Sequence, residues 1–504
     1  MPPYDGTHVK DRRIAQRLAD EVGRIEKQAP FTVALAYPSP YSVGMSSLGF
    51  QRIYRAIQET PGMACERVFA HDEDDSPSHL VSYEGRRPLS AFGVVAFSVA
   101  YELEIGGLVR MLDSSGIPAE RALRNEHHPL IIAGGPLTFS NPLPLAGMVD
   151  AIVLGEAELL TIDVLRAIES ESCRAKKLDA LAKLPHVFVP THHERLPSVA
   201  AVDNVILPAW APIRTPHTEF SNMFLIETER GCSRGCTYCV MRRSTNGGMR
   251  IVPMDEILAR IPIDARRVGL VGAAVSDHPK VVDIVNTLAE RGCEVGLSSL
   301  RPDRLSDEFV GALKRAGYRT LTTAMDGTSE RVRESLERRA RIKHLIRAAE
   351  LARVHRMDRL KLYLMVGVPG ETDEDIDECT QFVSELSAIV PVALGIAPFC
   401  SKRNTPLDRR PYAGIRTIDA RLARLRRGLA GRADVRATSA KWAWVEYVLA
   451  QGGEAEGLLA MKASREGGSF ASYKRAFSEL GHNARSEAPP EKKALPILDP
   501  VMSS

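Results

Sequence analysis

Three cysteines crowded into one short stretch are the part of this sequence best suited to chemistry. Cys232, Cys236 and Cys239 lie in GCSRGCTYC, residues 231–239, while the other five of the eight cysteines in the 504-residue chain are scattered. Thiolates bind soft metals, but a structural zinc site needs a closed set of four ligands, and His278 would be a distant choice for the fourth. The polar neighbours of the cysteines argue against three buried structural thiols.

An iron–sulfur cluster suits these cysteines better than a single metal ion does. Closely spaced thiolates on a loop hold four-iron clusters, with one thiolate on each iron. Three cysteines leave the fourth iron open, and an open iron is the binding position that a catalytic site needs. The sequence therefore predicts a [4Fe-4S] cluster held by Cys232, Cys236 and Cys239.

A regular alternation of strands and helices surrounds the cysteines. Six segments are predicted as strands, with a helical segment between each pair: 223–228, 268–274, 294–300, 319–325, 359–366 and 392–398. Repeated β/α units predict a parallel barrel, complete or open on one side, whose chemistry lies at the carboxyl ends of its strands. The cysteine stretch directly follows the first of these strands, so it lies where a catalytic site is expected.

The N-terminal third shows a second, less regular alternation. Strand candidates alternate with helical patterns there, at 31–37, 94–100, 130–133 and 151–154, which predicts an α/β domain with helices on both faces of a parallel sheet. We expect five parts: a Rossmann-like, doubly wound domain over 1–175, a linker over 176–220, a partial (β/α)6 TIM-like barrel over 221–410, a small helical C-terminal region over 411–483 and a disordered tail over 484–504.

Composition narrows the class of protein but does not identify a partner. The chain is 44% hydrophobic and 26% charged with a net charge of +3, as in ordinary soluble domains, and no aromatic–basic platform indicates nucleic acid. No apolar run approaches the roughly 20 residues that span a bilayer, and the polar N-terminus lacks a signal-peptide core. We therefore expect a cytoplasmic protein with reduced thiols and no membrane partner.

The form C-x3-C-x-Tyr-C at 232–239 resembles the cluster motif of the radical S-adenosylmethionine (SAM) superfamily. The resemblance implies that SAM chelates the open iron through its amino and carboxylate groups. One electron, from a donor such as flavodoxin or ferredoxin, then cleaves the sulfonium and yields a 5′-deoxyadenosyl radical. The resemblance also places Tyr238 among the cofactor-binding residues.

Two strand ends carry text similar to the family's SAM-binding segments. LMVGVPGET (364–372) resembles the turn that holds the adenine, with Gly367 and Pro369 as binding residues. Taken alone it is an ordinary strand-to-helix turn, with Thr372 or the residue after it as N-cap. TTAMDGTSERVR, after the fourth strand, looks like the family's acidic-x-Gly-Ser segment and implies that Asp326 binds the ribose.

The ends of the second and third strands are less similar to the family. LVGAAVSDHP lies where family members carry a glycine-rich segment for the SAM amino group, but it lacks the Gly-Gly-Glu form. The candidate ligands are Gly272, Ala273, Ser276 and Asp277 from the second strand end, and Ser298 and Arg301 from LSSLRPD at the third. The Arg301 guanidinium would suit the SAM carboxylate, but an ordinary surface arginine is an equal interpretation.

The sixth strand ends in APFCSKRNTP (397–406), which resembles the family's Pro-x-x-x-Lys-x-x-x-Thr-Pro turn. Its Cys400 is a lone thiol at a strand end that faces the expected site. This leaves open a methyl transfer through a cysteine carrier. A buried core thiol is the plainer interpretation, because free cysteine is commonly buried.

The first domain resembles the cobalamin-binding domain that precedes many radical SAM cores. Ser98, Gly134 and Gly135 match that family's serine after the third strand and the paired glycines that make room for the nucleotide tail. The glycine pair is also consistent with a tight turn that needs positive φ. PSPYSVG (38–44) stands where an Asp-x-His-x-x-Gly segment would supply an imidazole to cobalt. Either cobalamin binds without a protein ligand, or the domain no longer binds it.

The resemblance thus implies a radical SAM enzyme that abstracts hydrogen from an unactivated carbon of an unknown substrate. With cobalamin the product would be C-methylated. Without it the reaction would be an oxidation, a rearrangement or a sulfur insertion. Two alternatives without catalysis remain open at this point, an iron–sulfur electron-transfer or sensor protein and a zinc protein.

Overall fold

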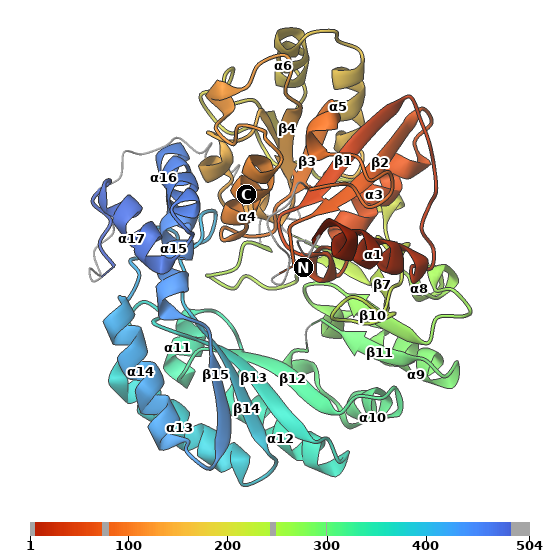
Figure 1. Cartoon of the computed structure of the whole chain (residues 1–504). Coiled ribbons are helices and arrows are strands. Elements are labelled where there is room, and N and C mark those ends of the chain that lie inside the picture. The colour runs from red at the N-terminus through yellow and green to blue at the C-terminus, as the bar shows by residue number, and fades with distance from the viewer. Residues whose placement is uncertain (1–5, 73–79, 242–247, 299, 485–504) are drawn as a thin grey trace, which may run out of the picture. The chain divides into compact units, whose positions relative to one another are not determined.

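The computed structural model describes residues 6–72, 80–241, 248–298 and 300–484, so the tail predicted over 484–504 lies outside the described residues except for its first position. The chain forms two compact units, whose elements are labelled in Figure 1. The first unit contains the chain up to Asn222 together with Gly452–Gly481, and the second consists mainly of Met223–Gln451. No helix in the described ranges is long and apolar enough to cross a membrane.

The first unit is built on a six-stranded sheet in the order β2-β1-β3-β4-β5-β6. Its strands are β1 Phe31–Tyr37, β2 Met63–Phe69, β3 Val94–Ser98, β4 Leu130–Gly134, β5 Ala151–Val153 and β6 Val187–Phe188. The first five are parallel, and β6, inside the segment expected as a linker, is antiparallel. This strand order is that of a doubly wound α/β sheet, which confirms the Rossmann-like prediction.

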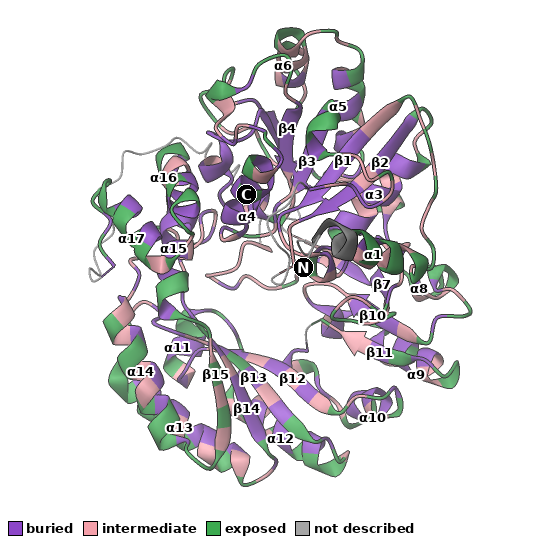
Figure 2. Ribbon diagram, in the orientation of Figure 1, coloured by how far each residue is buried: buried purple, intermediate pink, exposed green. Residues whose placement is uncertain are grey.

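Apolar runs explain the strands at the centre of this sheet. β1 has the sequence FTVALAY, and its last five residues are buried. Figure 2 shows β1, β3 and β4 largely in the colour of buried residues. Strands that are covered on both faces have continuous apolar sequences, and for this reason they could be predicted from the sequence. The helices that the N-terminal part of the chain contributes to this unit are α1 Gly6–Ala19, α2 Tyr41–Gly44, α3 Leu48–Glu59, α4 Glu104–Ser114, α5 Leu160–Glu169 and α6 Arg174–Ala182.

Strand β2 was not predicted, because charged residues interrupt its sequence MACERVF. Arg67, in the middle of the strand, is fully buried. Its guanidinium pairs with Glu21 at 2.7 Å and with Glu84 at 2.6 Å. A buried charge is tolerated when partners neutralise it, so the strand lies inside the unit although its pattern is not apolar.

Two helices from the end of the chain pack on the first unit. α16 (Glu454–Arg465) and α17 (Phe470–Ser478) lie in the region 411–483 that was expected to be helical. A Cβ on Gly457 of α16 would lie 1.8 Å from the Pro144 carbonyl oxygen, so the absent side chain permits this close approach. The Arg465 guanidinium binds the Asp113 carboxylate of α4 at 2.8 Å. The first unit is therefore completed by residues from both ends of the sequence.

The second unit contains the six strands predicted for the barrel. Together with a strand that was not predicted, β15, they form a three-stranded sheet in the order β11-β10-β7 and a four-stranded sheet in the order β12-β13-β14-β15, all with parallel pairing. The strands are β7 Phe224–Glu227, β10 Arg267–Val271, β11 Glu294–Leu297, β12 Thr320–Asp326, β13 Arg359–Val366, β14 Val392–Pro398 and β15 Ala433–Ala437. Among the described strands β11 and β12 do not pair, so the arrangement is open between them, as one form of the prediction allowed.

Helices cover one face of these strands. They are α8 Met254–Arg260, α9 Val281–Glu290, α10 Asp307–Arg315, α11 Glu330–Ser335, α12 Ile342–Val354, α13 Asp373–Ser387, α14 Ile415–Gly428 and α15 Ala440–Gln451. Along β12 and β13 buried residues alternate with partly or fully exposed ones. Such alternation indicates a sheet packed on one face only. β15 was not predicted, because its sequence ADVRA has no buried residue.

Candidate functional site at the strand ends of the second unit

The three cysteines lie on a loop whose two ends are held together by short strands. β8 (Glu229–Gly231) leads into the loop and pairs antiparallel with β9 (Met249–Ile251) after it. Within the loop, the Cys239 amide donates to the Cys236 carbonyl at 3.2 Å. The Thr237 amide donates to the Leu336 carbonyl just after α11, also at 3.2 Å. These bonds fix the cysteine segment against the strand ends.

The cysteine thiols lie near one another and are partly sheltered from water. Cys236 is buried, and Cys232 and Cys239 are half-buried. Burial raises the pKa of each thiol, and the charge of Cys232 further raises those of Cys236 and Cys239. In the described residues no three His, Cys, Asp or Glu side chains converge closely enough to hold one metal ion. A cubane cluster binds each thiolate to a different iron, so this set of three thiols fits such a cluster.

A network of ion pairs anchors the cysteine loop to the ends of β10 and β11. Between the first two cysteines, Ser233 donates to Asp277 at 2.7 Å and Arg234 binds Asp303 at 2.5 Å. Arg301 joins the two acids, at 2.5 Å from Asp277 and 3.2 Å from Asp303. Its side chain is 2% exposed. Arg301 is therefore not a surface arginine, and its guanidinium already has two carboxylate partners.

Asp326 at the end of β12 lies beside the cysteine loop, as the sequence predicts. The strand has a bulge there, and Asp326 adopts φ of 64°, a left-handed conformation that is uncommon for a residue other than glycine. Its carboxylate is ion-paired with Arg338 and accepts a hydrogen bond from the Tyr238 hydroxyl. Arg338 is also hydrogen-bonded to the Cys236 thiol. Burial raises the pKa of Asp326, against the opposing effect of Arg338.

Sequence reasoning missed Arg338, which links the ribose candidate to the cluster candidate. It lies in the run ERRAR, residues 337–341, where neighbouring arginines look like a solvated helix face. In the structure Arg338 is 8% exposed, whereas Arg339 is exposed. The signal in the sequence was weak, because only the fold brings residue 338 to residues 236 and 326.

The turn after β13 is shaped by two glycines with positive φ. Gly367 and Gly370 have φ of 86° and 80°, which favour glycine. The Gly367 amide donates to Glu371 at 2.6 Å, and the Thr328 hydroxyl donates to the other carboxylate oxygen of Glu371 at 2.7 Å. Glu371 thus ties the turn after β13 to the turn after β12. Thr372 is the N-cap of α13, as expected.

A cavity of about 280 Å³ lies at this turn. Pro369, one of the two predicted adenine-binding residues, lines it together with Val368, Gly370 and Leu407. The structure therefore brings Pro369 to a cavity at the end of a barrel strand, where a planar apolar group could bind.

A buried carboxylate that was not among the predicted residues, Glu229, lies at the end of β10. The Glu229 carboxylate accepts from the Ala274 amide at 2.7 Å and from the Thr228 hydroxyl at 2.5 Å. A Cβ on Gly272 would lie 2.0 Å from this carboxylate, so Gly272 makes room for it. Burial raises the pKa of Glu229 to about 7. Glu229 was missed because it precedes the cysteines, whereas the family's acid is expected after the second strand.

The other candidates near β10 mainly support the backbone. Ser298 donates to the Gly272 carbonyl at 2.7 Å, and Ser276 accepts from the Arg301 amide at 3.1 Å. Ala273, between Gly272 and the buried Ala274, is partly exposed. These hydrogen bonds join the residues that follow β10 to those that follow β11.

Two further candidates have protein partners instead of ligand roles. The ring nitrogens of His278 contact the Val252 carbonyl at 2.8 Å and the Lys280 amide at 3.1 Å, so this residue does not complete a zinc set. The half-buried Cys400 thiol donates to the Ala443 carbonyl at 3.1 Å.

The cobalamin candidates lie in the other unit, at the carboxyl edge of its sheet. Ser98 and Gly134 end β3 and β4, and the Val99 amide donates to the Gly134 carbonyl at 2.9 Å. Gly135 has φ of 101°, and a Cβ there would lie 2.7 Å from the Val99 carbonyl oxygen. The space beside Gly135 is therefore filled by the backbone of the neighbouring loop, as its interpretation as a tight turn requires.

At the switch point between β1 and β3, where doubly wound sheets bind ligands, one carboxylate bonds to the loops after both strands. The Glu104 carboxylate accepts from the Ala100 amide at 2.6 Å and from the Ser39 hydroxyl at 3.0 Å. The short helix α2 stands where the histidine segment would be. Helix α2, Tyr41–Gly44, contains no histidine, so it offers no imidazole to cobalt.

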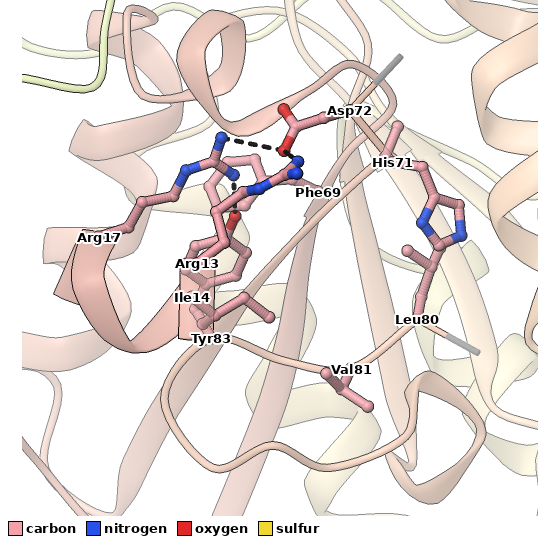
Figure 3. A pocket seen from close by; sticks show the side chains of 10 residues that line it. Arg13, Ile14, Arg17, Phe69, His71, Asp72, Leu80, Val81 and Tyr83 are labelled. Carbon is pink, nitrogen blue, oxygen red and sulfur yellow. Dashed lines mark hydrogen bonds and ion pairs between the residues drawn. The ribbon is translucent and has the colours of Figure 1, made fainter. Parts of the chain in front are cut away.

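A pocket of the first unit, of about 20 Å³, lies between α1 and the segment that follows β2 (Figure 3). Arg13 and Arg17 both bind Asp72, at 2.8 and 2.9 Å, and Arg17 also donates to the Tyr83 hydroxyl at 2.8 Å. Asp72 is the shared partner of both arginines, and the volume of the pocket suits a water molecule more than a substrate.

Family models match both units of the chain. A family model described as "Radical SAM proteins, N-terminal" matches residues 49–190, and one described as "Radical SAM superfamily" matches residues 226–383. The second match contains the three cysteines, Asp326 and Gly367.

The chain is similar to several curated proteins and to solved structures. An uncharacterized protein of Methanocaldococcus jannaschii is 25% identical over 75% of this chain and 79% of its own length. A ribosomal protein uS12 methylthiotransferase of Geobacter sulfurreducens is 26% identical over 37% of this chain and 44% of its own length. A structure of the apo cobalamin-dependent S-adenosylmethionine radical enzyme OxsB has a TM-score of 0.50 at 11% identity. That likeness covers 70% of this chain and 51% of the other, so this chain matches about half of that enzyme's length and shares its fold.

Proposed function

The chain is a radical SAM protein with an N-terminal domain ahead of its radical SAM domain, and on that premise we propose that it is an enzyme that cleaves SAM reductively to act on an organic substrate. The observation that carries the proposal is the position of the three-cysteine loop. Strands β8 and β9 close this loop, and Asp326, Tyr238 and Arg338 connect it to the end of β12. An electron carrier would have no need of these strand-end groups.

Each element of the site has a separate role in the proposal. Cys232, Cys236 and Cys239 would hold a [4Fe-4S] cluster, which when bound supplies the electron that converts SAM to methionine and a 5′-deoxyadenosyl radical. Asp326 would accept hydrogen bonds from the ribose, and the cavity at Pro369 would take the adenine. The buried Glu229 would accept hydrogen bonds from the SAM amino group in place of the family's acid. A flavodoxin- or ferredoxin-type donor would supply the electron to the protein.

Cobalamin-dependent C-methylation is the finer form of the proposal. The resemblance of the first domain supports it, whereas Glu104 at the switch point and the packed loop at Gly135 do not. Because α2 offers no imidazole to cobalt, we derive no step through cobalamin. Incubation of the full chain with hydroxocobalamin, followed by gel filtration, decides whether the first unit holds it. If none is retained, the outcome after radical formation is an oxidation, a rearrangement or a sulfur insertion.

The test of the proposed function is anaerobic reconstitution with iron and sulfide, followed by reduction in the presence of SAM. We expect four irons per chain, charge-transfer absorbance, and slow release of 5′-deoxyadenosine and methionine without substrate. Stoichiometric zinc without that absorbance would reject the cluster. Bound SAM that stays intact under strong reductants would reject the radical chemistry.

A further inference from the structure

The face of β12, β13 and β14 that points away from the helices leads to the cysteine loop. The helices α12, α13 and α14 pack on the other side of these strands (Figure 1), where every second residue of β13 from Leu360 to Val366 is buried. The residues of β13 on the face away from the helices, called the open face, are Arg359, Lys361, Tyr363 and Met365. Met365, near the carboxyl end, packs on the same small apolar cluster as Tyr238 of the cysteine loop. The open face therefore continues into the proposed site.

An exposed aromatic ring, that of Tyr363, lies in the middle of the open face. The residue is 45% exposed, and its neighbour on β14 is Gly395. A Cβ on Gly395 would lie 2.6 Å from the Tyr363 ring, so the ring leans across β14 into the space that the absent side chain leaves. Along β13 it is two residues, or about 7 Å, from Met365. The sheet thus holds a ring in one place, exposed to solvent and close to the strand ends.

The Lys361 ammonium lies over this ring, 4.7 Å from its centroid. The Lys361 Cε would be 3.8 Å from a Cβ on Gly395, so both side chains lean over the same glycine. Lys361 has no carboxylate partner among the residues that the structure describes. Its neighbour on β12 is the partly exposed Thr322, whose hydroxyl has no hydrogen-bond partner in the described ranges either. An ammonium and a hydroxyl therefore lie side by side on the open face, and the described chain uses neither.

The open face carries an excess of positive charge. Arg359, two residues before Lys361, is exposed and has no ion pair in the described part of the chain. The strands β12 to β15 contain two acidic residues, Asp434 and Asp326. Asp434 is bound by Arg436 at 2.9 Å, and Asp326 has its own arginine, as described above. The charge of this face is thus complementary to an anion.

We infer that Lys361 and Thr322 bind an anionic oxygen group, a carboxylate or a phosphate, of the molecule on which the radical acts, and that an apolar part of the same molecule lies against Tyr363. The inference rests on the proposed function and adds to it a class of substrate. An ammonium is a point charge that suits either group, and a hydroxyl donates one further hydrogen bond. From Lys361 to Met365 is four residues, or about 13 Å, so an elongated small molecule held at Lys361 reaches the strand ends.

The test is saturation-transfer NMR of the reconstituted full chain with benzoate, with phenyl phosphate and with benzyl alcohol, a neutral molecule of similar size. We expect at least one of the two anions to bind, more tightly than benzyl alcohol does, and the tighter anion identifies the group. Lys361→Met should weaken its binding about tenfold or more, because a charge-assisted hydrogen bond is lost. Lys361→Arg, which keeps the charge, should retain most of the binding. Lys343→Met, the same change at an exposed lysine of α12, should leave it unchanged.

A second pair of variants tests the ring without changing a charge. The methyl group of Gly395→Ala must displace the Tyr363 ring, so it should weaken binding of the same anion severalfold. Tyr363→Phe keeps the ring and should bind the anion as the wild type does. Equal binding by Gly395→Ala and the wild type would remove Tyr363 from the inferred site.

Thermal unfolding checks that the variants are folded. The inference is rejected if neither anion binds the wild-type chain, if benzyl alcohol binds as tightly as the anions, or if Lys361→Met binds them equally well. It is also rejected if SAM displaces the anion, because the anion would then occupy the SAM site. The proposed function is judged separately, by cluster content and SAM cleavage of the wild-type chain, so the two can fail independently.

Discussion

Both units are built from strand–helix alternation, but their carboxyl edges differ. In the first unit the central strands are buried on both faces, and Glu104 closes the switch point by bonding to Ser39 and Ala100. In the second unit β12 and β13 are buried on one face only, and cavities of about 280 and 500 Å³ lie at the strand ends. The residues that follow the strands thus differ in what they do: in the first unit Glu104 bonds across the strand ends, and in the second unit cavities lie beside them.

Replacement of the loop cysteines should have the largest effect on the second unit while leaving the first unit unchanged. Replacing Cys232, Cys236 or Cys239 with Ala should abolish the cluster and reduce SAM cleavage to background, because three thiolates are the minimum set proposed. The first unit should stay folded, since its core is its own. Iron analysis and hydrogen exchange of β1 and β3 measure the two effects, with Cys293→Ala as a control outside the loop. Loss of protection in β1 or β3 would show that the units are not independent.

Arg67→Met should do the reverse: it should destabilise the first unit and leave the cluster of the second unit intact. It leaves the carboxylates of Glu21 and Glu84 buried without their partner, which should destabilise that unit by about 3–5 kcal/mol. Cluster content and SAM cleavage should persist at temperatures where the first unit is still folded. Urea unfolding followed by hydrogen exchange provides the measurement. Arg87→Met, at a more exposed arginine of the same unit, is the matched control and should have little effect.

A third change tests the second unit through pH. Burial raises the pKa of Glu229 from 4.5 to about 7, so the folded chain keeps this proton over a range in which the unfolded chain has lost it. Stability of the cluster-free second unit should therefore fall as pH rises from about 4.5 to 7, by roughly 3 kcal/mol. Glu229→Gln should remove this dependence, whereas Glu290→Gln, at an exposed position of α9, should not. Equal pH slopes for the wild type and Glu229→Gln, in urea unfolding, would contradict the assignment.

The smallest of these effects is expected at Asp326. Asn tolerates the left-handed conformation of this residue, so Asp326→Asn removes the charge without forcing the backbone to change. SAM binding should weaken by about 1.5–3 kcal/mol for each charge-assisted hydrogen bond that is lost. Equilibrium dialysis of the reconstituted enzyme measures this, with Asp307→Asn on α10 as control. An unchanged affinity would remove Asp326 from the ribose role.

Local patterns in the sequence predicted the strands with apolar sequences and the turns with characteristic residues. The cysteine loop, Asp326 and the turn at Gly367 lie where their motifs placed them, and Thr372 caps α13 as expected. Two strands were not predicted. β2 contains a buried charged residue, Arg67, and β15 has no buried residue, so neither has the apolar sequence of a central strand.

Partners that the fold brings from far along the chain could not be predicted in the same way. Arg301 was considered for the SAM carboxylate because nothing near it in sequence predicts its bond to Asp277, 24 residues away. Glu229 reaches Ala274 over 45 residues. Such pairs depend on which strand ends become neighbours, and that is a property of the sheet rather than of any short motif.

The return of α16 and α17 to the first unit has a consequence during protein synthesis. The ribosome releases the strands of that unit first, but the helices that complete it emerge only after the whole of Met223–Gln451 has been made. At about 5–20 residues per second this delay is on the order of 10–50 s. During that interval the surfaces of α4 and of the loop at Pro144 that α16 later covers are open to chaperones or to other nascent chains.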